Sequence, residues 1–208
     1  MFKLYYAPGS CALASHIALQ EAGAAYTTER IDFKSNQQNS PEYLAINPKG
    51  RVPSLVTDRG ILTETPAMLA YIAQSFPQAK LAPLDDPYTF AQVQAFNSYL
   101  CSTVHVAHAH KTRSYRWATD AASFADMKRL VPKTVAASFA LIERDMLKGP
   151  WVMGATYTVC DPYLFTLAQW LEGDGVDLST LPRVIEHRKR MSERPAVRQV
   201  MAEHLAPA

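Results

Sequence analysis

Cys11 combines a reactive side chain with a position at which that reactivity can be used. It follows the strand-like run Phe2–Tyr6 and directly precedes a helix-like run that begins at Ala12. The first N–H groups of a helix have no partner within the helix, and together with the helix dipole they favour negative charge nearby. Because the thiolate is the reactive form of cysteine, this position favours sulfur chemistry or the binding of a sulfur ligand. A buried, inert thiol is the alternative interpretation.

A histidine lies on a polar face of a helix predicted over residues 90–110. Apolar side chains recur there at helical spacing, but one face carries Ser98, Cys101, Ser102 and His105. A polar face on an otherwise apolar helix is expected where the helix lines a cleft. An imidazole at such a place can donate to a thiolate or take its proton near neutral pH. A solvated histidine, or one satisfied in the core, is the alternative.

The other histidines and the cysteines do not form a metal-binding pattern. His108 and His110 cannot lie on one face of a helix, and no carboxylate or cysteine completes a ligand set with them. The three cysteines, Cys11, Cys101 and Cys160, are far apart, odd in number and outside any CxxC motif. We therefore expect no metal, no disulfide framework and a reducing, cytoplasmic location.

Composition and charge exclude several classes of protein. The 208 residues are 48% apolar and 19% charged, as in an ordinary soluble globular protein. The net charge is only +2, and the densest basic cluster, residues 188–190, lies near a predicted helix end, where cations are favoured. No apolar run is long enough to span a bilayer, and a break at Pro8 and Gly9 argues against a signal peptide. We expect neither nucleic acid nor membrane as a partner.

The first 80 residues or so alternate between strand and helix patterns. Strands are predicted at Phe2–Tyr6, 26–31, 51–56 and 60–62, and helices at 12–23, from residue 41 and at Thr65–Ser75. Serine followed by proline at residues 40 and 41 is a typical helix start. This order of elements predicts a mixed sheet covered by helices, an α/β domain.

The rest of the chain is predicted to be helical. Residues 79–87 show neither a helix nor a strand pattern, and three prolines lie in or beside them. This segment is therefore a predicted linker. Helical patterns follow at 90–110, 124–147, 161–171, 181–191 and Pro195–Leu205. The predicted organisation is an α/β domain over residues 1–78, a linker over 79–87 and an all-α domain over 88–208.

This organisation, with cysteine at the first strand-to-helix turn, resembles the glutathione transferase family, and its bacterial beta class in particular. The resemblance covers nearly the whole chain and rests on four passages, at residues 3–11, 47–53, 62–65 and 158–165: KLYYAPGSC, NPKGRVP, LTET and TVCDPYLF. Their order and separation are specific. The resemblance implies a thioredoxin-like first domain that binds glutathione and a helical second domain that shapes the site for the second substrate.

The resemblance assigns the cysteinyl unit of glutathione to the backbone around Pro53. In the family this proline is cis, and the residue before it, here Val52, pairs with the peptide as an added strand would. The Val52-Pro53 bond is at a position where a cis peptide can persist. An ordinary trans proline that opens an edge strand is the alternative. Arg51 is expected to add a polar contact.

The resemblance assigns the γ-glutamyl end of glutathione to Glu64 and Thr65. A hydroxyl together with unpaired N–H groups at a helix start can bind a carboxylate, and Pro66 suits the first helical position. Glu64 would accept from the γ-glutamyl amino group. Thr65 as a helix cap is the alternative, and both interpretations can hold together. Ser102, on the face shared with His105, is expected to contact glutathione as well.

At the glutathione sulfur the resemblance places Cys11 and His105. Tyr6 aligns with a tyrosine of the beta class, and Ser10 is a second hydroxyl beside Cys11, so either is a candidate for activating the thiol. Val106 stands where close relatives carry a basic residue, which puts in doubt one charged contact with glutathione.

Thr158 and Asp161 form a motif of a different kind. They resemble a capping box, with aspartate in place of the usual glutamate or glutamine. We expect Asp161 to be needed for folding and not for catalysis, and Cys160 to be an inert packing thiol.

The predicted function is glutathione transfer, in which the bound thiolate attacks an electrophilic carbon and detoxifies an apolar acceptor. Catalytic candidates are Cys11, His105, Tyr6 and Ser10, and glutathione contacts are Arg51, Val52, Pro53, Glu64, Thr65 and Ser102. Glutathione is the expected co-substrate, with no cofactor. Two alternatives stay open: a thiol-disulfide reductase or peroxidase with Cys11 as nucleophile, and a non-catalytic carrier of apolar ligands.

Two further expectations concern the acceptor and the assembly. Tyr115, Arg116 and Trp117 are predicted to line the acceptor pocket, with surface or core positions as the alternative. By resemblance, the protein is expected to be a homodimer in which the first domain of one subunit contacts the second domain of the other.

Overall fold

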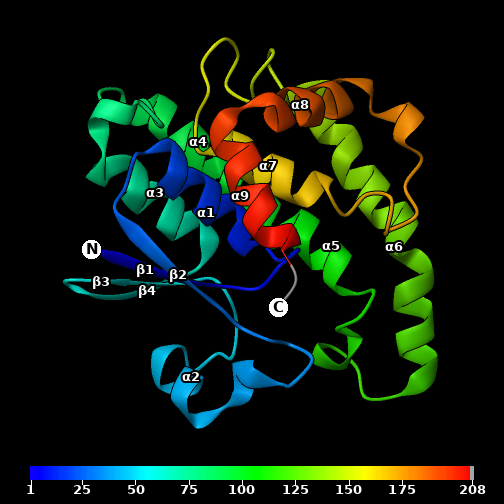
Figure 1. The fold of residues 1–208 in the computed structure, drawn as a ribbon. Coiled ribbons are helices and arrows are strands. Elements are labelled where there is room, and N and C mark those ends of the chain that lie inside the picture. The colour runs from blue at the N-terminus through cyan, green and yellow to red at the C-terminus, as the bar shows by residue number, and fades with distance from the viewer. Residues whose placement is uncertain (207–208) are drawn as a thin grey trace.

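The computed structural model describes residues 1–206 and shows two parts of different architecture (Figure 1). A four-stranded sheet and its helices occupy the first part, and helices alone make up the second. A segment with one turn of 3-10 helix, Pro77–Ala79, lies between them. The α/β thioredoxin-like architecture followed by an all-α part is the predicted fold class.

The sheet is mixed, with the strand order β2-β1-β3-β4. Strand β1 (Phe2–Tyr6) runs parallel to β2 (Tyr26–Arg30) and antiparallel to β3 (Ser54–Thr57), so that Leu4 lies opposite Leu55. Strands β3 and β4 (Gly60–Thr63) form a hairpin closed by Thr57 and Gly60. Because β1 is central, its carboxyl end delivers the chain directly to the turn that carries Cys11.

Three helices cover the sheet. Helices α1 (Ala12–Glu21) and α3 (Thr65–Ser75) pack against each other on one face, and α2 (Pro41–Ile46) lies on the other (Figure 1). The Ser40 hydroxyl accepts from the Tyr43 N–H at 3.2 Å, and Pro41 occupies the first turn, which confirms the helix start read from the sequence. Residues 12–19 of α1 are buried, since α7 and α9 cover the side of α1 that the sheet leaves open.

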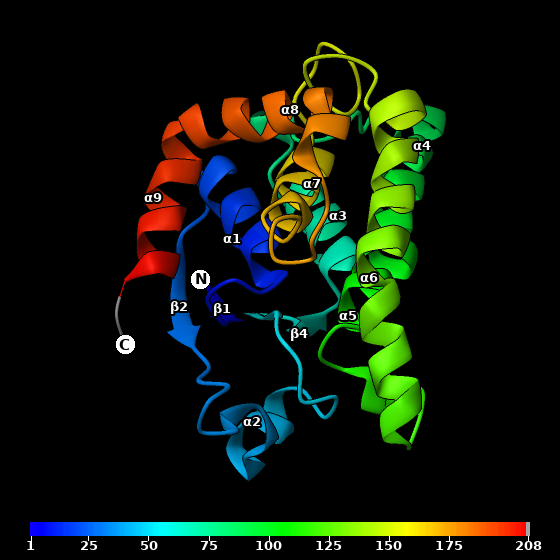
Figure 2. The same ribbon diagram turned by 90° about the vertical axis from the view of Figure 1, so that its right-hand side faces the viewer.

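The second part is built around two long helical segments that lie side by side (Figure 2). The first consists of α4 (Pro87–Tyr99), a π-helical segment (Leu100–Val104) and α5 (His105–Ala109). The second consists of α6 (Ala121–Leu141) and a π-helical segment (Ile142–Met146). Helices α7 (Cys160–Ala168), α8 (Pro182–Glu193) and α9 (Pro195–Leu205) complete it. Among residues 1–206, no helix combines the length and apolarity needed to cross a membrane.

Two of these helices start earlier than their apolar periodicity predicts. The carboxylate of Asp86 accepts from the N–H groups of Tyr88 and Thr89, and Asp120 does the same for Ser123, so α4 and α6 start at Pro87 and Ala121 instead of near residues 90 and 124. The π-helical segments also interrupt both predicted runs. The first of them directly precedes His105.

Helix α7 is the buried spine of the second part, and all nine of its residues are buried. The carboxylate of Asp161 is fully buried and accepts from Thr158 N at 2.7 Å, Val152 N at 2.8 Å and His187 Nε2 at 3.0 Å. The Thr158 hydroxyl accepts from the Cys160 N–H. This is the predicted capping arrangement, extended by a buried histidine, and it supports a structural role for Asp161.

The two parts share one hydrophobic core. It runs from Leu4 and Leu55 in the sheet through Leu69 in α3 to Leu100 and Leu164 in the second part. Shared packing of this kind fixes the cleft between the parts, since core side chains tolerate little displacement.

Candidate functional site

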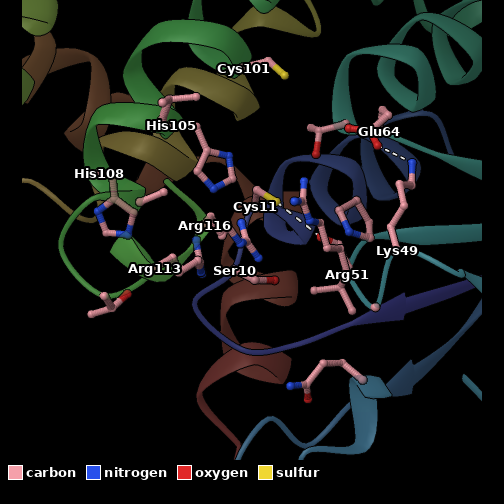
Figure 3. Close-up of a pocket in the computed structure, with 18 of the residues that line it drawn as sticks. Ser10, Cys11, Lys49, Arg51, Glu64, Cys101, His105, His108, Arg113 and Arg116 are labelled. Atoms are coloured by element: carbon pink, nitrogen blue, oxygen red, sulfur yellow. Dashed lines mark hydrogen bonds and ion pairs between the residues drawn. The ribbon is translucent and has the colours of Figure 1, made fainter. Parts of the chain in front are cut away.

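A pocket of about 1210 Å³ lies where the two parts meet (Figure 3). One wall comes from the turn before α1, the segment before β3 and the start of α3. The other comes from α5, the irregular segment after it, and α7. The volume exceeds the range of about 300–1,000 Å³ that is usual for a single small ligand. The pocket therefore has room for two substrates at once.

Cys11 lies at the centre of the pocket and at the N-cap of α1 (Figure 3). Its Sγ donates to the Val52 carbonyl oxygen at 3.5 Å. Burial raises the pKa of the Cys11 thiol, while a hydrogen bond with Thr65 and the charge of Arg113 oppose that rise. Burial thus opposes the easier ionisation that a position before a helix favours, and it is the largest influence on the pKa of this thiol.

The backbone of Val52 faces the pocket beside Cys11. The Val52-Pro53 peptide bond is cis, and both residues line the pocket. Within residues 1–206 the Val52 N–H donates to no other atom, and the Val52 carbonyl accepts only from Cys11. This is the free backbone edge on which an extended peptide can form strand-like hydrogen bonds.

Glu64 and Thr65 lie at the start of α3, and both line the pocket. Glu64 has φ 72°, a left-handed conformation that residues other than glycine rarely adopt and that is often retained at functional sites. Thr65 is the first helical residue, so it is not the N-cap, and its side chain is buried. Lys49 Nζ forms an ion pair with Glu64 and donates to Thr63 Oγ1 at 2.7 Å. A carboxylate acceptor, a hydroxyl and the helix N-terminus thus meet at one end of the pocket.

His105 is the first residue of α5 and lies on the wall opposite Val52. Its ring centroid is 5.1 Å from that of Trp170, whose Nε1 donates to the Gly9 carbonyl near Cys11 at 3.0 Å. Burial, and then the charge of Arg113, lower the pKa of His105 to about 4. The imidazole is therefore neutral at pH 7, able to accept one proton or donate one.

Tyr6 and Ser102 do not line the pocket, so the structure does not bring these two predicted site residues to it. The Tyr6 ring packs instead against His204 and His16, with ring centroids 4.7 and 5.6 Å away. Ser102 is exposed and donates to the Ser98 carbonyl at 2.8 Å. Of the side chains predicted to share a face with His105, Cys101 lines the pocket and Ser102 does not.

Ser10 lines the pocket, but its hydroxyl already has partners. Ser10 Oγ donates to the Ala7 carbonyl at 2.6 Å and accepts from the Ala12 N–H at 3.3 Å. The side chain therefore stabilises the turn that enters α1. Because the Ser10 hydroxyl proton is donated to the Ala7 carbonyl, Ser10 in the observed rotamer cannot donate it to a sulfur atom.

The residues predicted for the acceptor side line the pocket, together with others that sequence reasoning missed. Tyr115, Arg116 and Trp117 all line the pocket, as predicted. Arg113 lines it as well, two residues before the predicted segment, and this proximity was the available signal. Lys49 also lines the pocket, and it belongs to the passage NPKGRVP at residues 47–53, which carries the resemblance to the family. That passage was the available signal for Lys49.

His108 is a further lining residue that was not predicted. Its Nδ1 lies 2.7 Å from Oδ2 of the buried Asp174, and its ring stacks on Trp170 at a centroid distance of 4.2 Å. These contacts fasten α5 to the segment after α7. No sequence signal connects His108 with a carboxylate 66 residues away along the chain.

Comparison with known proteins agrees with this geometry. Residues 1–74 match the family model "Glutathione S-transferase, N-terminal domain". The glutathione S-transferase GstA of Escherichia coli O157:H7 is 32% identical over 203 residues, which cover 96% of this chain and 97% of GstA. A maleylacetoacetate isomerase of Pseudomonas aeruginosa is 27% identical to this chain. Its alignment covers 95% of this chain and 94% of the isomerase.

Two solved structures extend the comparison to three dimensions. A glutathione transferase homologue from Sulfitobacter, solved with bound glutathione, is 45% identical with a TM-score of 0.95, and 99% of each chain is covered. The bacterial beta-class glutathione S-transferase of Sphingomonas chungbukensis is 30% identical with a TM-score of 0.85, and 98% of each chain is covered. The pocket, the fold and these relatives together show that the chain belongs to the glutathione S-transferase family and is an enzyme of that family.

Proposed function

We propose that this protein transfers glutathione to small, largely apolar electrophiles and so detoxifies them. The glutathione thiolate forms a bond with an electrophilic carbon, a leaving group departs with its electron pair, and the thiol proton passes to solvent. The observation that carries this proposal is the meeting of Cys11, the free backbone edge of Val52 and the start of α3 at Thr65 in one pocket. Aromatic side chains of Tyr115 and Trp117 on the facing wall suit an apolar acceptor.

Rate enhancement in this proposal comes from position and electrostatics. Two substrates held together in one pocket react as in a unimolecular step, which lowers the entropic part of the barrier. The raised pKa keeps Cys11 a thiol at neutral pH, so Cys11 can donate a hydrogen bond to the glutathione thiolate. The neutral His105 can donate a second hydrogen bond to that thiolate. Glutathione is the co-substrate, and the proposal gives no role to a metal or another cofactor.

The test is conjugation of glutathione to 1-chloro-2,4-dinitrobenzene by the wild type and two Thr65 variants. Thr65→Val removes the hydroxyl at the γ-glutamyl end, and Thr65→Ser retains it. We expect Thr65→Val to raise the KM for glutathione about tenfold, the value of one hydrogen bond to a charged group. Thr65→Ser should stay close to wild type. Wild type without glutathione-dependent turnover would contradict the proposal.

Thiol-disulfide exchange is the second candidate function, since Cys11 is a free thiol that lines the pocket. In that reaction the Cys11 thiolate attacks a glutathionyl disulfide, the other sulfur leaves as a thiolate, and a second glutathione releases the mixed disulfide. Cys11→Ala separates the two functions. It should reduce conjugation while leaving glutathione binding intact, whereas it should abolish exchange. Complete loss of conjugation in Cys11→Ala with binding intact would favour exchange.

A homodimer in the cytoplasm is also part of the proposal. Ile61 on the edge strand β4, together with Leu84 and Tyr88 near the start of α4, are exposed apolar side chains on the two parts that such a dimer joins. The three free cysteines suit a reducing compartment. Light scattering should give twice the chain mass of 23.1 kDa. A monomer at micromolar concentration would contradict the dimer.

A further inference from the structure

The pocket carries more positive charge than its own carboxylate neutralises. Among the lining residues of the described chain, four are cationic, namely Lys49, Arg51, Arg113 and Arg116, and Glu64 is the one carboxylate. Lys49 pairs with Glu64. Within residues 1–206 none of the three arginines has an ion-pair partner, and the contact of Arg116 is with the Tyr115 ring, 6.0 Å away. Three guanidinium charges thus remain available to ligands.

Arg113 is the most unusual of the three because it is half-buried without a counter-ion. Burial lowers its pKa first, and the like charge of Arg116 lowers it further. Arginine nevertheless stays charged in proteins, and charged groups withdrawn from water are normally paired. An anionic ligand at this position would supply the missing partner.

Glutathione accounts for part of this charge. With its sulfur as thiolate it carries a net charge of −2, and the lining side chains carry +3 when the histidines are neutral. If its γ-glutamyl end is at Glu64 and Thr65 and its cysteinyl unit at Val52, Arg51, which precedes Val52 and lines the pocket, can pair with its glycine carboxylate. One positive charge remains after glutathione has bound.

The remaining charge lies on the acceptor side of the site. Arg113 and Arg116 belong to the segment after α5, and Figure 3 shows them across the pocket from Lys49 and Glu64. Arg113 and Cys11 line the same pocket, and the charge of Arg113 opposes the rise that burial causes in the pKa of Cys11. Tyr115 and Trp117 lie beside the two arginines. This wall therefore offers a flat apolar surface next to a fork of donors that fits a carboxylate.

We propose that the acceptor is an electrophile with an apolar body and a carboxylate, and that Arg113 and Arg116 bind this carboxylate while the reactive carbon faces Cys11. The inference rests on the proposed glutathione transfer and specifies its substrate class. Bidentate pairing with a planar guanidinium fixes the orientation of the acceptor as well as its affinity.

The experiment compares two acceptors that differ in charge but hardly in shape, 4-chloro-3,5-dinitrobenzoate and 4-chloro-3,5-dinitrobenzamide. In both, the glutathione sulfur bonds to the chlorinated carbon, chloride leaves with the bonding electrons, and the thiol proton goes to solvent. Each enzymatic kcat/KM is divided by the rate constant of the uncatalysed reaction, which removes differences in intrinsic reactivity. We expect the corrected value to be about tenfold higher for the carboxylate, the factor of one charge-assisted hydrogen bond.

Variants locate the effect. Arg113→Gln and Arg116→Gln should each lower the ratio of carboxylate to amide turnover several-fold, mainly through the KM of the carboxylate acceptor. Arg198→Gln, on the surface of α9 away from the pocket, should keep the wild-type ratio. Adding salt should lower the ratio in wild type, because screening weakens a partly exposed ion pair.

The outcomes separate this inference from the function on which it rests. Turnover of both acceptors with equal corrected kcat/KM would overturn the anionic acceptor and leave glutathione transfer standing. A ratio that Arg113→Gln and Arg116→Gln leave unchanged would also overturn it. No glutathione-dependent turnover of either acceptor, in a wild type that is folded by circular dichroism, would overturn the proposed function itself.

Discussion

At the scale of single residues, burial decides the chemistry of Cys11 more than its place at a helix start does. A helix N-terminus stabilises a nearby negative charge by about 0.3–1 kcal/mol when exposed. Withdrawal of the thiolate from water costs more, and the pKa of Cys11 is raised. The residue is therefore suited to donate a hydrogen bond to a bound thiolate at neutral pH.

This assignment predicts slow alkylation of Cys11 in the absence of glutathione. Its rate with iodoacetamide should rise with pH through pH 9 without levelling off, because the thiolate fraction keeps growing. Mass spectrometry of the peptide that contains Cys11 measures the rate and separates it from reaction at Cys101. A rate that levels off below pH 7 would contradict a raised pKa.

The neutral state of His105 predicts a second result. Its pKa of about 4 lies below the usual value, so the ring is uncharged throughout the range from pH 5.5 to 8. His105→Gln should lower kcat, but the pH profiles of kcat for wild type and variant should run parallel over this range. A wild-type inflection near pH 6.5 that His105→Gln removes would show that the histidine titrates during catalysis.

At the scale of elements, the start of α7 depends on Asp161. Its buried carboxylate accepts from two backbone N–H groups and from His187, and removal of the carboxylate leaves all three without a partner. Asp161→Ala should lower the free energy of unfolding by about 3–5 kcal/mol. Asp126→Ala, which breaks an exposed ion pair with Arg129 in α6, should cost at most about 1 kcal/mol. Urea unfolding monitored by circular dichroism compares the two, and equal costs would refute the role of Asp161.

The same elements show where sequence patterns stop being informative. Helices α4 and α6 were predicted from their apolar spacing, and their starts were missed because Asp86 and Asp120 cap them through side-chain geometry. The π-helical segment before His105 leaves no mark in the sequence, and Ser102, predicted on the face of His105, is exposed and does not line the pocket. Short-range periodicity predicts that a helix exists, but it does not predict which side chains of that helix reach the pocket.

At the scale of the whole molecule, a buried histidine pair joins the two ends of the chain. His16 Nδ1 in α1 and His204 Nε2 in α9 are 3.1 Å apart, and both side chains are buried against Tyr6. Burial lowers the pKa of His16 to about 3 and that of His204 to about 4. Protonation of either ring therefore destabilises the packing of α9 against the first part of the molecule.

This pair predicts acid sensitivity. The folded pKa values of both histidines lie below the usual 6.5, so the unfolded chain binds protons at a higher pH than the folded protein does. The contribution of the pair to the free energy of unfolding is therefore fully present above pH 6.5 and is lost as the pH falls toward 4. Each histidine contributes a slope of about 1.4 kcal/mol per pH unit in this window. His204→Gln should flatten the dependence of unfolding free energy between pH 6.5 and 5, measured by urea unfolding. Gln199→Ala, on the same helix, should keep the wild-type slope, and an unchanged slope in His204→Gln would contradict the account.

The histidine pair also explains why Tyr6 was wrongly expected in the site. Its ring direction is set by His204, which lies 198 residues away in the chain, and no local pattern near Tyr6 contains that information. Cys11, Val52 and Thr65 were predicted because short passages with recognisable order carry them. Arg113 was missed although it lies only two residues before the predicted segment, because no periodicity marks which side of this irregular segment faces the cleft.

The central claim is that the pocket binds glutathione with its sulfur at Cys11. The most direct measurement is a calorimetric titration of wild type and Cys11→Ala with glutathione, followed by mass spectrometry of both proteins after incubation with glutathione disulfide, from which exchange at Cys11 releases one glutathione. The account predicts saturable binding to both proteins, one glutathione per chain, and a glutathione adduct on Cys11 in wild type alone. The absence of binding in both proteins would contradict it.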